Sequence, residues 1–141
     1  MSPMKKLISA YAAAIVLAAG LLGCNLDVPP ISAATCTTYV AGIPGPHRQL
    51  TSLQLQALSK WLTGHRTEWS RTVATHVPRT VIEMEHEGGT TSLNLWSRLL
   101  IASGPFGQYQ RTLSEDEART LAGIVDPDGA VLFNGAPDIS D

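Results

Sequence analysis

The chain has 141 residues, and 10 Lys and Arg against 12 Asp and Glu give it a formal net charge of −2. This length accommodates one small domain with short additional segments and excludes a second sizeable core. The nearly balanced charge argues against electrostatic capture of a polyanion, so no nucleic-acid partner is expected.

The first segment is an apolar run from Leu7 to Leu22, preceded by Lys5 and Lys6. The run is short and rich in alanine for a transmembrane helix, whereas a charged start and an apolar middle are typical of a secretory signal. It ends in Leu-Leu-Gly-Cys at residues 21–24. This ending resembles the lipobox of bacterial lipoproteins, and the resemblance covers residues 1–24 only.

The resemblance implies that residues 1–23 are a signal peptide, cleaved between Gly23 and Cys24. The Cys24 sulfur would carry a diacylglyceryl group, and the new amino terminus would be acylated. Two or more acyl chains anchor a protein stably, so membrane lipid is the first expected partner. Asn25 follows in place of the Asp that marks inner-membrane retention, which favours the periplasmic face of the outer membrane. The inner membrane and the cell surface stay open as alternatives.

Residues 24–46 are interpreted as the lipidated Cys followed by a flexible tether, because they contain Pro29-Pro30, a run of small residues and a Gly/Pro-rich end. A coil of roughly 22 residues spans about 25–28 Å. A short edge strand at Tyr39-Val40 is the alternative. Cys36 falls in this segment as a lone thiol, either free or paired with another chain, and the free form is favoured.

The body begins with a helix after Thr51. Thr51 and Gln54 have the spacing of a capping box, and Leu50 and Leu55 have the spacing of a hydrophobic staple. Gly64 is expected to end this helix. Its predicted buried stripe consists of Leu55, Leu58, Trp61 and Leu62.

The central part of the body alternates with a period of two, which is typical of strands. Residues 80–86 place Ile82 and Met84 opposite Glu83 and Glu85, and Gly88-Gly89 then predicts a turn into a strand over 93–99. Weaker flanking strands are predicted within 69–74 and 108–112.

A second helix is predicted after Ser114, which forms a capping box with Glu117. Its inner face is Ala118, Leu121, Ala122 and Val125. The expected fold is therefore α+β, a small antiparallel four-stranded meander flanked by an N-terminal and a C-terminal helix, in the order α-β-β-β-β-α. Residues 47–125 form the globular body, and 126–141 form an acidic C-terminal tail.

Neither a metal nor a cofactor is predicted. The four histidines, His47, His65, His76 and His86, lack the spacing of metal ligands. Alternation separates Glu83 and Glu85 from His86 on opposite strand faces. No nucleophile motif occurs, and the acidic residues already have local roles as helix caps or solvated strand residues. The sequence therefore predicts that the protein is not an enzyme.

Surface recognition remains as the expected mode of action. Alternation places Trp96 opposite the predicted core side chains and beside Arg98, and Trp with Arg is typical of interface hot spots. Trp69 and Tyr109 complete the candidate interface. The alternative is that helices cover both sheet faces, which would make Trp96 a core residue.

The predicted function is that of a non-enzymatic, lipid-anchored protein facing the periplasm, which binds an envelope or periplasmic protein as an accessory, inhibitor or immunity factor. The first alternative is a glycan or small-ligand binder that uses Trp69 and Trp96 as stacking platforms. A small hydrolase, with Ser and His meeting only in the fold, is the third hypothesis.

Overall fold

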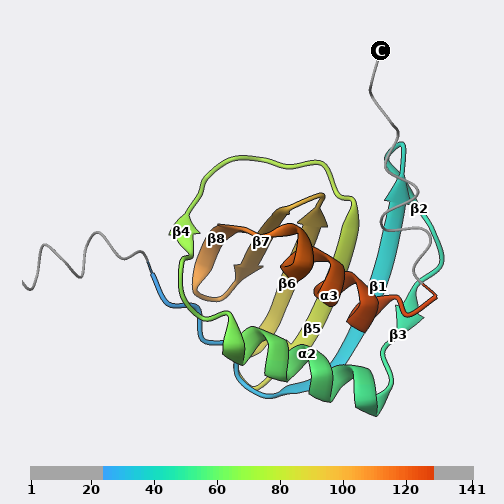
Figure 1. The fold of residues 1–141 in the computed structure, drawn as a ribbon, viewed down its shortest axis with the longest axis horizontal. Helices are drawn as coiled ribbons and strands as arrows, with labels where there is room; N and C mark the ends of the chain where they lie inside the picture. Colours follow the sequence, from blue (N-terminus) through green and yellow to red (C-terminus); the bar gives the residue numbers. More distant parts are fainter. Residues whose placement is uncertain (1–23, 129–141) are drawn as a thin grey trace, which may run out of the picture.

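The computed structural model describes residues 24–128 (Figure 1). The predicted signal peptide, with Gly23, and residues 129–141 of the predicted tail lie outside this range. Within residues 24–128, no helix has both the length and the apolar character needed to cross a membrane.

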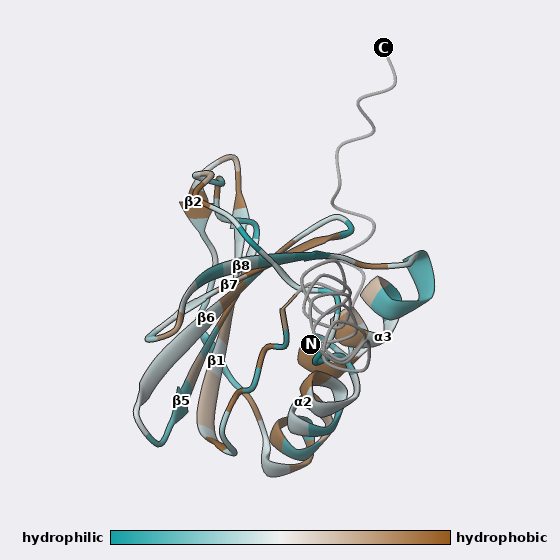
Figure 2. Ribbon diagram, turned by 90° about the vertical axis from the view of Figure 1, so that its left-hand side faces the viewer, coloured by the Kyte–Doolittle hydropathy of each residue, from teal (hydrophilic) through white to brown (hydrophobic). Residues whose placement is uncertain are grey.

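One antiparallel sheet of eight strands dominates the fold, in the order β2-β1-β5-β6-β7-β8-β4, with β3 paired to β1. Helices α2 (Ser52–Gly64) and α3 (Glu115–Val125) both lie on one side of this sheet (Figure 2). The strands are β1 (Ile31–Val40), β2 (Ile43–Pro44), β3 (Arg48–Gln49), β4 (Ser70–Arg71), β5 (Thr80–His86), β6 (Gly89–Trp96), β7 (Leu99–Gly104) and β8 (Gly107–Thr112).

Both helices begin with the capping boxes that the sequence predicts. Thr51 Oγ1 accepts from the Gln54 backbone N–H at 3.2 Å, and the Gln54 side chain accepts from the Thr51 N–H at 2.8 Å. Ser114 and Glu117 form the same pair of bonds at 3.1 and 2.9 Å. The end of α2 differs slightly from the prediction, because Gly64 is still helical and His65 is the C-cap.

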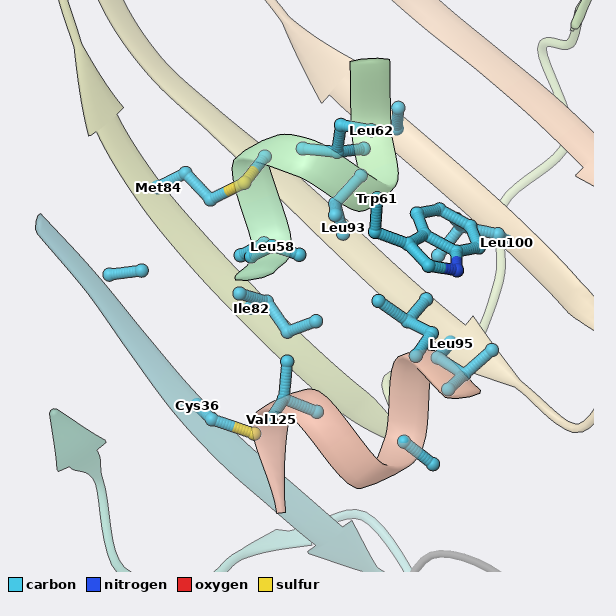
Figure 3. Close-up of a cluster of buried hydrophobic side chains, with 14 of the residues drawn as sticks. Cys36, Leu58, Trp61, Leu62, Ile82, Met84, Leu93, Leu95, Leu100 and Val125 are labelled. Carbon is cyan, nitrogen blue, oxygen red and sulfur yellow. The ribbon is translucent and has the colours of Figure 1, made fainter. Parts of the chain in front are cut away.

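The core lies between the two helices and the facing side of the sheet (Figure 3). Ile82 and Met84 are fully buried, whereas Glu83 and Glu85 are exposed, which confirms the predicted alternation of β5. The helices contribute the predicted stripes. Their buried residues are Leu58, Trp61 and Leu62 of α2 and Ala118, Leu121, Ala122 and Val125 of α3.

The expected four-stranded meander flanked by helices is wrong, because the sheet has twice that number of strands. Two long strands were not predicted. One is β7, which pairs with β6 and β8, and the other is β1, which pairs along β5. The weak strand expected within 69–74 shrinks to β4, which has only two residues.

Residues 24–46 are not a flexible tether. They contain β1, in which Cys36 lies opposite Ile82 and Ala34 lies opposite Met84, so the side chains of Cys36 and Ala34 face the core. Cys36 is fully buried instead of lying on an extended coil. Small residues in β1 allow the sheet to approach the helices closely there, which explains why a segment without large apolar side chains joins the core.

Asp126, the first residue of the predicted acidic tail, belongs to the folded body. Asp126 is the C-cap of α3 and is only 5% exposed. Its Oδ1 accepts a hydrogen bond from Arg48 Nη1 at 3.1 Å, which joins the end of α3 to β3.

Candidate ligand pocket on the outer face of the sheet

The outer face of the sheet, opposite the helices, is crossed by residues 72–79, which we name the strap. Figure 1 shows the strap in light green, arching from β4 to the start of β5. One end is held at β8, where the Thr72 N–H donates to the Gln108 carbonyl at 3.2 Å and Gln108 Nε2 donates to the Ala74 carbonyl at 2.8 Å.

The other end of the strap is clamped by one side chain of β6. Asn94 Nδ2 donates to the Val77 carbonyl at 3.2 Å, and Asn94 Oδ1 accepts from the Arg79 N–H at 3.0 Å. Because the amide satisfies two backbone groups of the strap, Asn94 fixes both its path and its distance from the sheet.

The sheet beneath the strap presents two rows of side chains. Strand register creates the rows, since Glu83 lies opposite Ser92 and Ser92 lies opposite Ser103. The polar row consists of Glu83, Ser92, Ser103 and Gln108, and the row beside it consists of Val81, Asn94 and Ile101. A row of hydrogen-bonding groups therefore runs next to two apolar side chains.

Strap and sheet together line a half-open pocket of about 400 Å³. The strap supplies Val73, Ala74, Thr75, His76 and Pro78 to its wall, and Tyr39 of β1 completes the lining. Small-molecule sites have volumes of roughly 300–1,000 Å³, so this pocket is large enough for a small ligand.

The electrostatics of the pocket are simple. Glu83 is the single Asp, Glu, Lys or Arg in its lining, and the Glu83 carboxylate forms no hydrogen bond or ion pair within the described part of the chain. His76 Nε2 is buried and has no hydrogen-bond partner among residues 24–128. The lining therefore offers a free carboxylate to a ligand, whereas the unpaired imidazole nitrogen is itself buried.

The geometry supports binding more than nucleophilic catalysis. An activated serine needs a hydrogen bond to its base. Ser103 Oγ instead donates to Gln108 Oε1 at 3.3 Å, and no hydrogen bond within residues 24–128 joins His76 to a serine or to Glu83. The groups that a hydrolase would need are thus present in the lining but are not linked.

The four residues of the predicted interface are not brought together. Trp96 is 41% exposed at the end of β6, and its ring centroid lies 6.3 Å from that of His76. Arg98 is exposed in the next turn, where Nε donates to the Leu113 carbonyl at 2.9 Å. Trp69 is only 1% exposed and belongs to the core, so it cannot stack on a ligand. Tyr109 lies opposite Ala102 and shares the helix-facing side of the sheet, away from Trp96.

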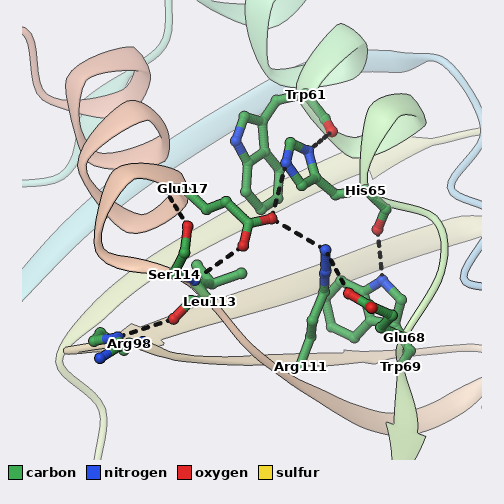
Figure 4. A network of polar contacts seen from close by, with 9 residues as sticks. All are labelled: Trp61, His65, Glu68, Trp69, Arg98, Arg111, Leu113, Ser114 and Glu117. Atoms are coloured by element: carbon green, nitrogen blue, oxygen red, sulfur yellow. Dashed lines mark hydrogen bonds and ion pairs between the residues drawn. The ribbon is translucent and has the colours of Figure 1, made fainter.

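A second cluster of titratable side chains lies where α2, α3 and β8 meet (Figure 4). Glu117 Oε2 lies 3.1 Å from Arg111 Nη2 and 3.1 Å from His65 Nε2. His65 Nδ1 lies 2.6 Å from the Trp61 carbonyl, and the two rings stack with centroids 4.0 Å apart. Because each partner belongs to a different element, this cluster joins the two helices to the sheet.

Within the described residues, no group of three or more His, Cys, Asp or Glu is placed to hold a metal ion. His86, for example, contacts Thr91 Oγ1 through Nε2 at 2.6 Å and the Glu87 carbonyl through Nδ1 at 2.9 Å. His47 Nδ1 lies 2.6 Å from Thr37 Oγ1.

The pocket was not predicted from the sequence. Alternation along β5 and β6 already places Glu83 and Asn94 on the outer face, which is a usable signal. The positions of Ser103 and Gln108 depend on β7 and its register, and the course of the strap has no sequence signature beyond Pro78.

Comparison of the chain with protein-family models, with curated proteins and with solved structures returned no match.

Proposed function

We propose that this protein is a non-enzymatic, lipid-anchored binding protein that faces the periplasm and takes a small ligand into the pocket beneath the strap. The pocket itself carries the proposal, because it is a half-open hollow of about 400 Å³, lined by hydrogen-bonding groups, on a sheet face without helices. The proposed lipid anchor and membrane location rest on the resemblance of residues 1–24 to a lipoprotein signal peptide. The exposure of Cys24, in contrast to the buried Cys36, leaves the Cys24 sulfur accessible for modification.

The lining favours a neutral or positively charged ligand with hydroxyl or amino groups. Glu83 can accept N–H or O–H donors, and Ser92 can donate or accept. Val81 and Ile101 offer a short apolar surface beside them. The lining contains no Lys or Arg, and its carboxylate repels anions, so a phosphate-bearing ligand is disfavoured.

A binding screen with matched variants tests this function. The purified protein in detergent is titrated with neutral N-acetylated sugars, with small amines and, for comparison, with a sugar phosphate, and heat of binding is measured. Loss of a charge-assisted hydrogen bond costs about 1.5–3 kcal/mol, so Glu83→Gln should weaken binding of the preferred ligand about tenfold or more.

Glu85→Gln is the control for that experiment, because Glu85 is exposed on the same face of β5 and does not line the pocket. Its affinity should equal that of the parent. Equal weakening by the two substitutions, or tightest binding by the sugar phosphate, would contradict a ligand site at Glu83.

A protein partner is the second candidate function, and exposed apolar side chains on the strap side favour it. Val73 is fully exposed, Val77 is 61% exposed and Trp96 is 41% exposed. Exposed large apolar side chains beside a pocket are typical of recognition surfaces. A protein-binding function of this kind would include the roles of envelope accessory, inhibitor or immunity factor.

A further inference from the structure

The residues that follow the proposed lipid attachment point are docked on the body. The Cys24 N–H donates to the Trp69 carbonyl at 2.8 Å, and the Trp69 N–H donates to the Cys24 carbonyl at 3.2 Å. The Leu26 N–H donates to the Arg66 carbonyl at 2.8 Å. Three backbone hydrogen bonds thus pair residues 24–26 with residues 66–69.

Side chains reinforce this pairing from inside the protein. Leu26 is 4% exposed and Trp69 is 1% exposed, so both are part of the core. Trp69 Nε1 donates to the His65 carbonyl at 2.8 Å, which ties the docked segment to the end of α2. The backbone that holds Cys24 is therefore rigid, while the Cys24 side chain is exposed.

Lipidation is compatible with this geometry. Acylation converts the amino terminus of Cys24 into an amide, which keeps one N–H for the Trp69 carbonyl. The diacylglyceryl group would be attached to the exposed sulfur, which makes none of these bonds.

We infer that the lipid anchor is fixed to the folded body without a tether, so that the surface formed by residues 66–71 lies against the headgroups of the bilayer. This inference rests on the proposed lipidation of Cys24. The acyl chains, not net charge, would hold the surface there, because exposed Arg66 and Arg71 are accompanied by Asp27 and Glu68. The β1–β2 hairpin, with Ile43 at its tip, lies at the opposite end of the molecule and would face the aqueous phase (Figure 1).

Site-directed spin labels on the full, lipidated protein in vesicles test the orientation. Thr67→Cys places a label on the surface formed by residues 66–71. Ile43→Cys places one on the β1–β2 hairpin, where Ile43 is 70% exposed. Cys36 is fully buried, so the protein without an added cysteine serves as the unlabelled control. Collisions of each label with a water-soluble nickel complex are compared with those of lipid-soluble oxygen.

We expect the label at residue 67 to lose collisions with nickel and to gain collisions with oxygen, relative to the label at residue 43. A Gly/Ser linker of about ten residues, inserted between Asn25 and Leu26, spans roughly 16–19 Å and should abolish this difference. The insertion leaves the residue after Cys24 unchanged.

Two failures are distinguishable by mass spectrometry of the same samples. If Cys24 carries lipid but both labels collide with nickel equally, the body moves freely on its anchor and this inference is wrong. If Cys24 carries no lipid, the proposed address fails, and the inference fails with it.

Discussion

At the scale of single residues, Glu117 belongs both to the cap of α3 and to the cluster with Arg111 and His65. Its Oε1 caps α3 through the Ser114 N–H, and its Oε2 faces both Arg111 and His65. The pKa of Glu117 lies below its ordinary value, first because the Ser114 N–H stabilises the carboxylate and then because Arg111 and His65 lie close to it. Partial desolvation opposes this lowering of the pKa without reversing it.

Glu117→Gln should lower the free energy of unfolding in a pH-dependent manner. A lowered folded pKa means that the carboxylate contributes its full stabilisation above the unfolded pKa of about 4.3, and that this is lost as the pH falls through the folded pKa. Urea unfolding at neutral pH should therefore separate parent and variant, and the gap should close as the pH falls toward about 3.

Glu115→Gln is the control for this prediction, since the Glu115 side chain is 74% exposed and pairs with Arg119 at the surface. Its effect should stay within about 0.5 kcal/mol at every pH. A gap between the parent and Glu117→Gln that does not change with pH would show that the lowered pKa contributes nothing to stability.

Cys36 shows how far a residue's role depends on neighbours that are distant in sequence. Burial raises the pKa of its thiol, although Arg48 close by opposes the shift. The sequence alone places Cys36 on a flexible tether as a lone thiol. The thiol is instead buried, because β1 is packed against the helices, and its raised pKa disfavours it as a nucleophile.

At the scale of elements, the helices were predictable because their signals are local. Thr51 with Gln54 and Ser114 with Glu117 lie within one turn of each other, and the same residues that indicate a cap in the sequence form it in the structure. The buried stripes follow for the same reason, since residues three and four apart share a helix face.

Thr51→Ala and Ser114→Ala should each lower the free energy of unfolding by about 0.5–2 kcal/mol, because each leaves a first-turn N–H without its acceptor. The two caps share no partner, since Thr51 bonds Gln54 and Ser114 bonds Glu117. Their effects should therefore add in the double variant, as measured by urea titration. If the double variant has the same free energy of unfolding as the less stable single variant, the two caps do not act independently.

The strands were harder to predict because their boundaries depend on partners. β6 and β7 are separated only by Ser97 and Arg98, and Ser97 adopts a left-handed φ of 58° that glycine usually provides. Without glycine at this turn, two strands look like one in the sequence. β1 was missed for a different reason, since its small residues show no large alternating apolar side chains and its partner β5 lies far along the chain.

Asn94→Ala should release the strap, because it removes the hydrogen bonds to the Val77 carbonyl and the Arg79 N–H. Loss of two hydrogen bonds at a half-exposed site is expected to cost about 1–2 kcal/mol. Trypsin should then cut more rapidly after Arg71 and after Arg79, at the two ends of the strap, and ligand affinity should fall.

Gln110→Ala is the matched control for the strap, because Gln110 belongs to the same outer face, on β8, and its side chain makes no hydrogen bond within residues 24–128. Its digestion pattern should match that of the parent. Equal rates of cleavage in all three proteins would show that Asn94 does not hold the strap.

At the scale of the whole molecule, the pocket exists only because five strands and the strap converge. The outward orientation of Glu83 follows from alternation, and so does that of Trp96. The floor still requires the pairing of β6 with β7 and of β7 with β8, and the roof requires a segment without regular structure. These are relations between distant residues, and they lie outside what local periodicity can predict.

Trp96→Ala distinguishes a recognition surface from a core position. Trp96 is 41% exposed, so truncation should change the free energy of unfolding by no more than about 1 kcal/mol. Trp61→Ala is the comparison, and because Trp61 is 6% exposed in the core it should cost about 3–5 kcal/mol. If a protein partner binds the strap side, Trp96→Ala should also abolish its capture from envelope extracts. A stable variant that captures every partner of the parent would remove Trp96 from the second candidate function.

The position of β1 also determines when the sheet can be completed. The contacts among β5, β6, β7 and β8 close short loops, whereas pairing of β1 with β5 closes a long one at greater entropic cost. Residues 31–40 are synthesised before every other strand, and until residues 80–86 follow they can pair only with the two-residue strands β2 and β3. The edge of β1 that faces β5 can therefore be paired only after more than half of the chain has been synthesised. Such a delay fits the export across a membrane that we propose for this chain.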